Sequence, residues 1–254
     1  MKKIVEHKLN IQSDYQFHAL HEGNFFQRQW HRNRLLLIRY LSFLSSSDSV
    51  ADVGCGSGNV VLEFNKNVRK IVGFDYNDKA LEFLKVKIVK DKMINADVAE
   101  FDILSTVPVK YHHCFDKIIL NEVIEHFDER DIAKVLTNLS LMLRTDGKIL
   151  ITTPNYQLSP WPVLEFLIDR FNIYPSLWGE QHKIKFTPKR LSVLCHQNGF
   201  SLVRIGTFSL ISPFLALFGQ SPADWIAKME IRHLKIFGPQ IYAIFRKSKG
   251  GESQ

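Results

Sequence analysis

A glycine-rich run, Asp52-Val-Gly-Cys-Gly-Ser-Gly58, holds the residues best suited to contact a ligand. Gly54, Gly56 and Gly58 allow a tight turn after a strand and bring bare amide groups close to a ligand. Their spacing differs from the G-x-G-x-x-G of dinucleotide-binding loops, where a pyrophosphate lies on a helix N-terminus. Because Asp52 would repel a pyrophosphate, the run favours a ligand that carries an ammonium group.

Polar residues also follow three later segments that we expect to be strands. Asp75-Tyr76 follow residues 70–74, Asp97-Val98 follow the segment 93–96, and Asn121-Glu122 follow residues 116–120. The carboxyl ends of parallel strands share one sheet edge, where open α/β sheets bind their ligands. Acids at strand ends are also common helix caps, but four such features in succession favour one cofactor site.

These motifs resemble the class I S-adenosylmethionine-dependent methyltransferases, and the resemblance covers roughly residues 30–205. It implies that S-adenosylmethionine is the cofactor and that Asp52 and the loop glycines border its methionine portion. Asp75 has the spacing of a ribose-binding acid, about 20 residues past the loop. The resemblance further implies that Tyr76 packs on the adenine, and that Asp97, with Val98 beside it, receives the adenine amino group. Asn121 and Glu122 match the position beside the sulfonium and the methyl group.

The residues suited to catalysis lie in the run Asn121-Glu-Val-Ile-Glu-His-Phe127. Methyl transfer from a sulfonium is an in-line displacement, so the protein aligns the nucleophile, excludes water and in some cases removes a proton. If Glu122 opens a helical turn, Glu125 and His126 share its face, and a neutral imidazole there can accept a proton from a substrate hydroxyl. We expect His126 and Glu122 to be catalytic. The alternative is that Glu122 caps a turn while Glu125 and His126 hold the loop.

The same cluster also has a metal-binding interpretation. Glu122, Glu125, His126 and the distant His182 resemble the carboxylate and histidine set of small-RNA 2′-O-methyltransferases, and such ligands suit magnesium, manganese or zinc. The E-V-I-E-H run, however, also resembles ubiquinone-pathway O-methyltransferases, and other RNA-specific features are absent from the sequence. We expect no bound metal. A metal-dependent RNA 2′-O-methyltransferase, or another nucleic-acid methyltransferase, is the alternative.

Alternating strands and helices must position these residues. Strands are expected at residues 49–53, 70–74, 93–96, 116–120, 148–152, 200–205 and 240–246. Such alternation predicts a parallel sheet with right-handed crossovers. We therefore expect an α/β, Rossmann-like fold whose seven-stranded, mostly parallel sheet has helices on both faces and an antiparallel last strand. This domain spans residues 49–254, with insertions at about 155–186 and 208–238, and residues 1–48 form a loose lead-in and an amphipathic helix.

Composition excludes several other classes of protein. The 254 residues include 33 Lys and Arg, 26 Asp and Glu and 3 Cys, and the formal charge is +7. The basic residues are scattered, as on a solvated surface. Three widely spaced cysteines argue against a disulfide framework or a cysteine-based zinc site. No apolar run reaches the ~18–20 residues that span a bilayer, and MKKIVEHKLN does not read as a secretory signal, so we expect a cytoplasmic protein.

The two insertions bear on the acceptor and on partners. Aromatic residues crowd residues 161–178, and this stretch and residues 23–34 resemble methyltransferases found with bacterial polysaccharide or glycolipid assembly. That resemblance implies O-methylation of a small molecule, a lipid-linked intermediate or a glycan. Apolar and basic residues also mix in the second insertion and could lie on lipid or on a second subunit, although covering the sheet edge is the simpler explanation. They are Trp225, Ile226, Met229, Ile231, Ile236, Lys228, Arg232 and Lys235.

Overall fold

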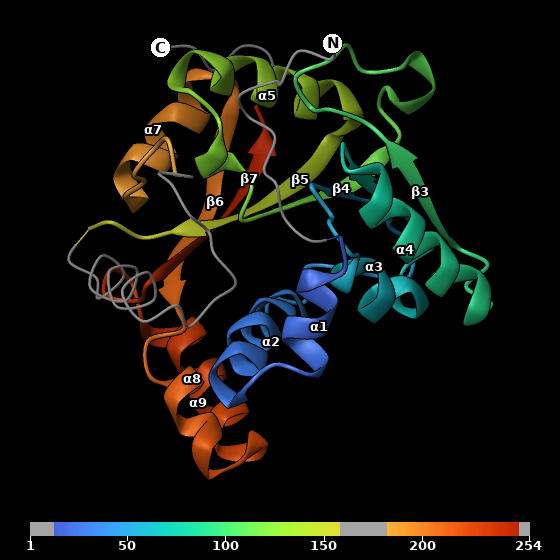
Figure 1. The fold of residues 1–254 in the computed structure, drawn as a ribbon. Helices are drawn as coiled ribbons and strands as arrows, with labels where there is room; N and C mark the ends of the chain where they lie inside the picture. The colour runs from blue at the N-terminus through green and yellow to red at the C-terminus, as the bar shows by residue number, and fades with distance from the viewer. Residues whose placement is uncertain (1–12, 158–181, 249–254) are drawn as a thin grey trace.

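The computed structural model describes residues 13–157 and 182–248, which contain a seven-stranded sheet of order β3-β2-β1-β4-β5-β7-β6. Its strands are β1 (Ser49–Val53), β2 (Lys70–Asp75), β3 (Ala96–Glu100), β4 (Phe115–Asn121), β5 (Leu143–Pro154), β6 (Phe200–Phe208) and β7 (Gln240–Lys247). Neighbours among β1–β5 pair in parallel, whereas β7 is antiparallel to both β5 and β6 (Figure 1). The expected Rossmann-like α/β fold with an antiparallel last strand is confirmed.

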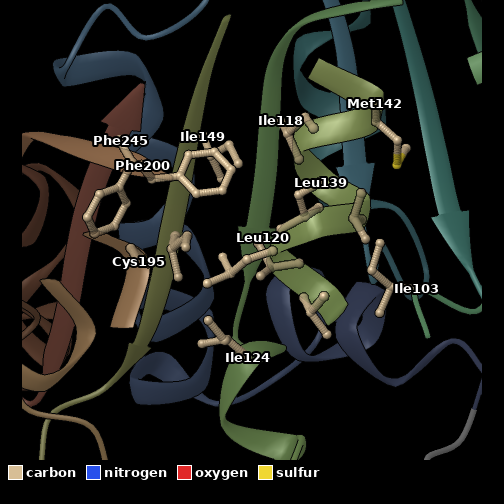
Figure 2. Packing of buried hydrophobic residues seen from close by; sticks show 14 of the residues in the cluster. Ile103, Ile118, Leu120, Ile124, Leu139, Met142, Ile149, Cys195, Phe200 and Phe245 are labelled. Carbon is tan, nitrogen blue, oxygen red and sulfur yellow. The ribbon is translucent and has the colours of Figure 1, made fainter. Parts of the chain in front are cut away.

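Helices cover both faces of the sheet. They are α1 (Tyr15–His21), α2 (Phe25–Tyr40), α3 (Asn59–Phe64), α4 (Asp78–Lys90), α5 (Glu129–Met142), α7 (Pro188–Gln197), α8 (Ser212–Leu215) and α9 (Gln220–His233). Residues of α5 and α7 share one apolar core with alternate strand residues such as Ile118 and Leu120 of β4 (Figure 2). Ile119 points to the opposite face, where α2, α3, α4 and α9 form the second core. Successive strand residues face opposite sides, so a stretch that is covered on both faces, such as residues 118–120, is continuously apolar.

A helix, α1, forms where the sequence predicts a loose lead-in. The Phe17 ring packs edge-on against Phe83 of α4 at a centroid distance of 5.3 Å. The Phe17 N–H donates to Ser57 Oγ at 2.8 Å, and the Gln16 carbonyl accepts a hydrogen bond from Asn59 Nδ2 at 2.8 Å. A seven-residue helix is unstable in isolation, so these tertiary contacts with α4 and the glycine-rich loop account for it.

The third strand begins later than the sequence predicts. Residues 93–96 are expected to form it, but β3 is Ala96–Glu100. After α4, Lys92 adopts a left-handed conformation (φ +52°) and the Met93 N–H donates to the Ile88 carbonyl. The residues just before Ala96 therefore belong to this turn and not to the strand. Asp97 pairs with Val72 inside the sheet. The prediction that Asp97 follows the strand is wrong.

Gly58 stands in a left-handed conformation (φ +82°) just before α3. A Cβ there would lie 2.4 Å from Leu84 Cδ1, whereas Gly199, with φ +81°, has nothing within 4 Å. We expect Gly199→Ala to lower the free energy of unfolding by about 1–2 kcal/mol, the cost of left-handed backbone. Gly58→Ala should lower it by about 2–5 kcal/mol, because overpacking adds to that cost. Urea denaturation measures both losses, and equal values would show that Leu84 moves aside freely.

Candidate active site

The glycine-rich loop connects β1 to α3 at the carboxyl edge of the sheet, beside the end of β2. The N–H groups of Gly54 and Cys55 donate to the Phe74 carbonyl at 2.7 and 3.0 Å. Gly54 and Gly56 have φ values of +73° and +50°, which glycine adopts without steric cost. The loop therefore makes the tight turn that its sequence predicts.

Asp75, the last residue of β2, anchors this loop. Its Oδ2 accepts a hydrogen bond from the Gly56 N–H at 2.8 Å, and its Oδ1 accepts one from the Asn77 N–H at 2.9 Å. The Asp75 side chain is buried, and the half-buried Tyr76 follows it in the turn to α4. The structure thus brings Asp75 and the glycine loop together, as their spacing predicts.

Asp52 is buried within β1, where its register partners are Gly73 and Ile119. Burial, and to a smaller degree the charge of Asp75, raises the pKa of Asp52 to about 8. The side chain therefore carries a proton at neutral pH. A buried carboxyl of this kind ionises when a cation lies beside it.

A cavity of about 30 Å³ adjoins Asp52 and Gly54. Asn121, the last residue of β4, also lines it, and Gln16 of α1 and Arg34 of α2 bound it from the N-terminal helices. The helices α1 and α2 lie in the segment that is predicted to be a lead-in and an amphipathic helix. They cover the edge of the sheet where Asp52 and Asn121 lie.

Glu122 pairs with Arg34 next to this cavity, at 3.3 Å between Oε2 and Nη2. Glu122 has a left-handed backbone (φ +55°) and precedes the 3₁₀ turn η3 (Ile124–His126). It therefore does not open a helical turn with Glu125 and His126 in the way that the sequence suggests. Within the described residues, Arg34 Nε and Glu122 Oε1 are buried and have no hydrogen-bond partner.

Glu125, His126 and His182 form a second polar group beside the first. Glu125 is fully buried, its Oε2 accepts a hydrogen bond from Thr153 Oγ1 at 3.1 Å, and its Oε1 has no partner in the described part of the chain. Burial, and then the charge of Glu122, raises the pKa of Glu125 to about 8.

The two histidine rings of this group lie 5.3 Å apart, and His182 Nδ1 lies 2.8 Å from the Tyr156 hydroxyl. One possible metal-ligand atom from each of Glu125, His126 and His182 lies within 4.8 Å of the others. The structure thus assembles three of the four residues of the metal-binding interpretation. Glu122 is not in this group.

Asp102 occupies the place along the sheet edge that the sequence analysis gives to Asp97. The Phe101 N–H donates to the Asp75 carbonyl at 2.9 Å, so Asp102 begins the loop next to the end of β2. Asp97 is exposed and lies three pairs before Asp75↔Glu100, about 10 Å from that edge; Val98 lies in the same strand. The sequence signal that could have found this position is Asp102 itself, an acid directly after Phe101. The β2–β3 register brings it to the edge of the sheet.

Sequence-local reasoning also misses Arg34, because α2 meets the run 121–127 only through the tertiary fold. Asn121, by contrast, lies where it is expected, at the end of β4. Its Oδ1 accepts a hydrogen bond from Thr152 Oγ1 of β5 at 2.6 Å. This contact joins the ends of two neighbouring parallel strands.

Comparison with known proteins relates this arrangement to one family. Residues 26–205 match the family model described as a methyltransferase domain. The chain belongs to this family. The methyltransferase domain is 27% identical over 110 residues to a probable cobalt-precorrin-6B C(15)-methyltransferase (decarboxylating) of Methanocaldococcus jannaschii, an alignment that covers 42% of this chain and 60% of that protein.

Two further comparisons extend over more of the chain. It is 25% identical over 206 residues to a probable ribosomal RNA small subunit methyltransferase A of Methanosphaera stadtmanae, which covers 66% of this chain and 75% of that protein. The crystal structure of a SAM-dependent methyltransferase from Archaeoglobus fulgidus superposes with a TM-score of 0.58 at 20% identity, over 93% of this chain and 100% of that one. The last comparison bears on the fold alone.

Proposed function

We propose that this methyltransferase domain uses S-adenosylmethionine to methylate a hydroxyl oxygen of a small molecule, a lipid-linked intermediate or a glycan. The observation that carries the cofactor part of the proposal is the paired polarity of the cavity, which Asp52 and Arg34 both line. The methionine portion of the cofactor carries an ammonium and a carboxylate, and these side chains offer each group a partner of opposite charge. A dinucleotide offers no ammonium to Asp52.

The residues around the cavity fit this cofactor. Arg34 Nε and Asn59 Oδ1 are a buried donor and a buried acceptor that remain unused within the described residues, and buried polar groups of this kind call for a partner. The cavity of about 30 Å³ is smaller than the methionine portion of the cofactor, so we expect Gln16 of α1 to move away from the loop when the cofactor binds. A Cβ at Gly56 would lie 2.4 Å from Gln16 Oε1, which shows how closely α1 approaches.

In the proposed reaction the cofactor supplies an electrophilic methyl group on a sulfonium. Asp75 would accept hydrogen bonds from the ribose hydroxyls, Asp102 would accept one from the adenine amino group, and Tyr76 would pack on the adenine. A ring nitrogen of His126 takes the proton of the acceptor hydroxyl as its oxygen attacks. Glu122 holds Arg34 in place through their ion pair, so we assign it a positioning role.

The Asp52 carboxyl should make cofactor affinity depend on pH. With a pKa of about 8, Asp52 is protonated in the free protein, and an ammonium beside it favours the carboxylate, so that binding releases a proton. We expect affinity to rise about tenfold from about pH 6 to about pH 7. Calorimetry of the wild type and of Asp52→Asn checks this expectation. The amino group of the ligand titrates equally with both proteins, so parallel pH profiles would contradict the role of Asp52.

A second candidate function is metal-dependent methylation of RNA. The observation that favours it is the approach of Glu125, His126 and His182 within 4.8 Å. The match to a probable ribosomal RNA methyltransferase and the charge of +7 point to the same substrate class. This function predicts turnover that stops in chelator, and RNA binding that weakens steeply with salt.

One experiment separates the two functions. Purified protein is incubated with methyl-labelled S-adenosylmethionine and with separate RNA, lipid, glycan and small-molecule fractions of a lysate, with and without chelator. Label in a non-RNA fraction that is unaffected by chelator supports O-methylation without a metal. Chelator-sensitive label in RNA supports the second function, and a failure to bind the cofactor in calorimetry would overturn both.

A further inference from the structure

The insertion between β6 and β7 folds into α8, the 3₁₀ turn η4 (Ala216–Phe218) and α9, which pack beside α2 at one end of the molecule (Figure 1). Large apolar side chains of this insertion are exposed, among them Phe218 (77%), Leu217 (63%) and Trp225 (61%). Phe214 and Phe237 are also about half exposed. Surfaces that gather several such residues commonly bind a partner or a membrane.

Both acids of this insertion are used inside the fold. Asp224 accepts hydrogen bonds from Arg32 Nη2 at 2.7 Å and from Arg32 Nε at 2.9 Å, which ties α9 to α2. The buried Glu230 accepts hydrogen bonds from Ser212 Oγ at 2.7 Å and from the Ser212 N–H at 3.1 Å, at the start of α8. Neither carboxylate is therefore available on the outer surface.

The basic residues of the insertion point outward. Lys228, Arg232 and Lys235 are exposed, and within the described residues no ion pair engages them. Along α9 the buried face is formed by Ala223, Ala227, Glu230 and Ile231. Trp225 and Arg232 lie on the opposite side, seven residues and thus nearly two turns apart.

We propose that this outer surface, formed by Leu217, Phe218, Trp225, Lys228 and Arg232, docks the protein on an anionic lipid bilayer. Aromatic side chains prefer the boundary between headgroups and acyl chains, and neighbouring Lys and Arg bind the anionic headgroups. Among the described residues, no helix combines the length and the apolar character needed to cross a membrane. In the proposed docking, α9 and η4 lie along the bilayer surface.

Charge favours the bilayer over a second copy of the chain. In a two-fold dimer the same patch meets itself, which would bring Lys228 and Arg232 of both copies together, whereas the two acids of the insertion, Asp224 and Glu230, are engaged inside the fold. An anionic bilayer supplies that missing charge. This surface shares no residue with the lining of the cofactor cavity, and docking through it does not depend on the identity of the methyl acceptor.

Vesicle flotation with the purified full chain tests the proposal. We expect binding to vesicles of phosphatidylcholine and phosphatidylglycerol in equal parts, and little binding to phosphatidylcholine alone. Lys228→Gln combined with Arg232→Gln should weaken binding about 30-fold, and Leu217→Ser combined with Phe218→Ser should abolish it. In addition, lipid should shift the tryptophan fluorescence of the wild type to shorter wavelength, but not that of Trp225→Phe.

Matched variants on a separate surface serve as controls. Lys85→Gln combined with Lys90→Gln removes two exposed charges of α4, and Ile94→Ser removes an exposed apolar side chain before β3. Losses as large in these controls as in the patch variants would overturn the proposal, as would equal binding to both vesicles or to neither. A lipid-independent dimer that dissociates in Leu217→Ser with Phe218→Ser would assign the surface to self-association instead.

Discussion

Calorimetric titration of Asp75→Ala is expected to show S-adenosylmethionine binding that is at least about 100-fold weaker than in the wild type. The substitution removes the carboxylate that would accept hydrogen bonds from two ribose hydroxyls, and a hydrogen bond to a charged group contributes about 1.5–3 kcal/mol. The substitution also removes the acceptor of the Gly56 N–H, so the loop is held less firmly before the ligand arrives. Both effects lower affinity.

Two variants make this test specific. Asp78→Ala removes another carboxylate three residues away, which is exposed in the first turn of α4 and accepts a local hydrogen bond from the Lys79 N–H. The affinity of this variant should match that of the wild type. Asp75→Asn keeps one carbonyl oxygen as an acceptor, so its affinity for S-adenosylmethionine should lie between those of Asp75→Ala and Asp78→Ala. Thermal unfolding without ligand shows whether Asp75→Ala remains folded. A folded variant with wild-type affinity would remove Asp75 from the ribose site.

The sheet was predictable because short, local sequence patterns mark its strands and the turns that follow them. The strand β2 is apolar at residues 71–74 and ends at Asp75, and Gly58 marks the turn from the loop after β1 into α3. Alternation of strands with helices then leaves few topologies. The boundary of β3 was less predictable, because Met93-Ile94 is as apolar as the strand itself. The β2–β3 pairing decides the register, and the acid at the sheet edge is therefore Asp102.

The part of the site that α1 and α2 contribute could not be predicted in the same way. Tyr15–His21 has little helical signal of its own, and its helix depends on contacts with Ser57, Asn59 and Phe83. Arg34 reads as one arginine among several on an amphipathic helix. Its place at the cavity follows from how α2 packs on the sheet, which no local pattern encodes.

Only the metal-binding interpretation predicted that His182 lies near His126. In the structure, the contacts of this pair also bear on proton transfer. The Tyr156 hydroxyl lies 2.8 Å from His182 Nδ1, and the ring of His182 lies next to that of His126. Beneath them Glu125, with a pKa raised to about 8, is neutral near pH 7. Glu125 therefore adds no negative charge beside the two imidazole rings near pH 7, and the Tyr156–His182 contact links this group to residues after β5.

Replacing His126 with glutamine is therefore expected to lower kcat about 10²–10⁴-fold while the affinity for S-adenosylmethionine stays unchanged. The imidazole would take the proton of the acceptor hydroxyl, and glutamine can hydrogen-bond to that hydroxyl but cannot remove its proton. Transfer of labelled methyl to the acceptor fraction measures the rate. His196→Gln, an exposed histidine near the end of α7, is the matched control and should be fully active.

The pH profile separates a base from a metal ligand at this position. Without a base, the rate of His126→Gln should rise about tenfold for each unit of pH, as hydroxide takes over the proton transfer, whereas the wild-type rate should level off. If His126 instead holds a metal, chelator should silence the wild type, and His182→Gln should be as inactive as His126→Gln. A His126→Gln protein with wild-type kcat would show that the acceptor loses its proton elsewhere, and that His126 serves only to hold the loop.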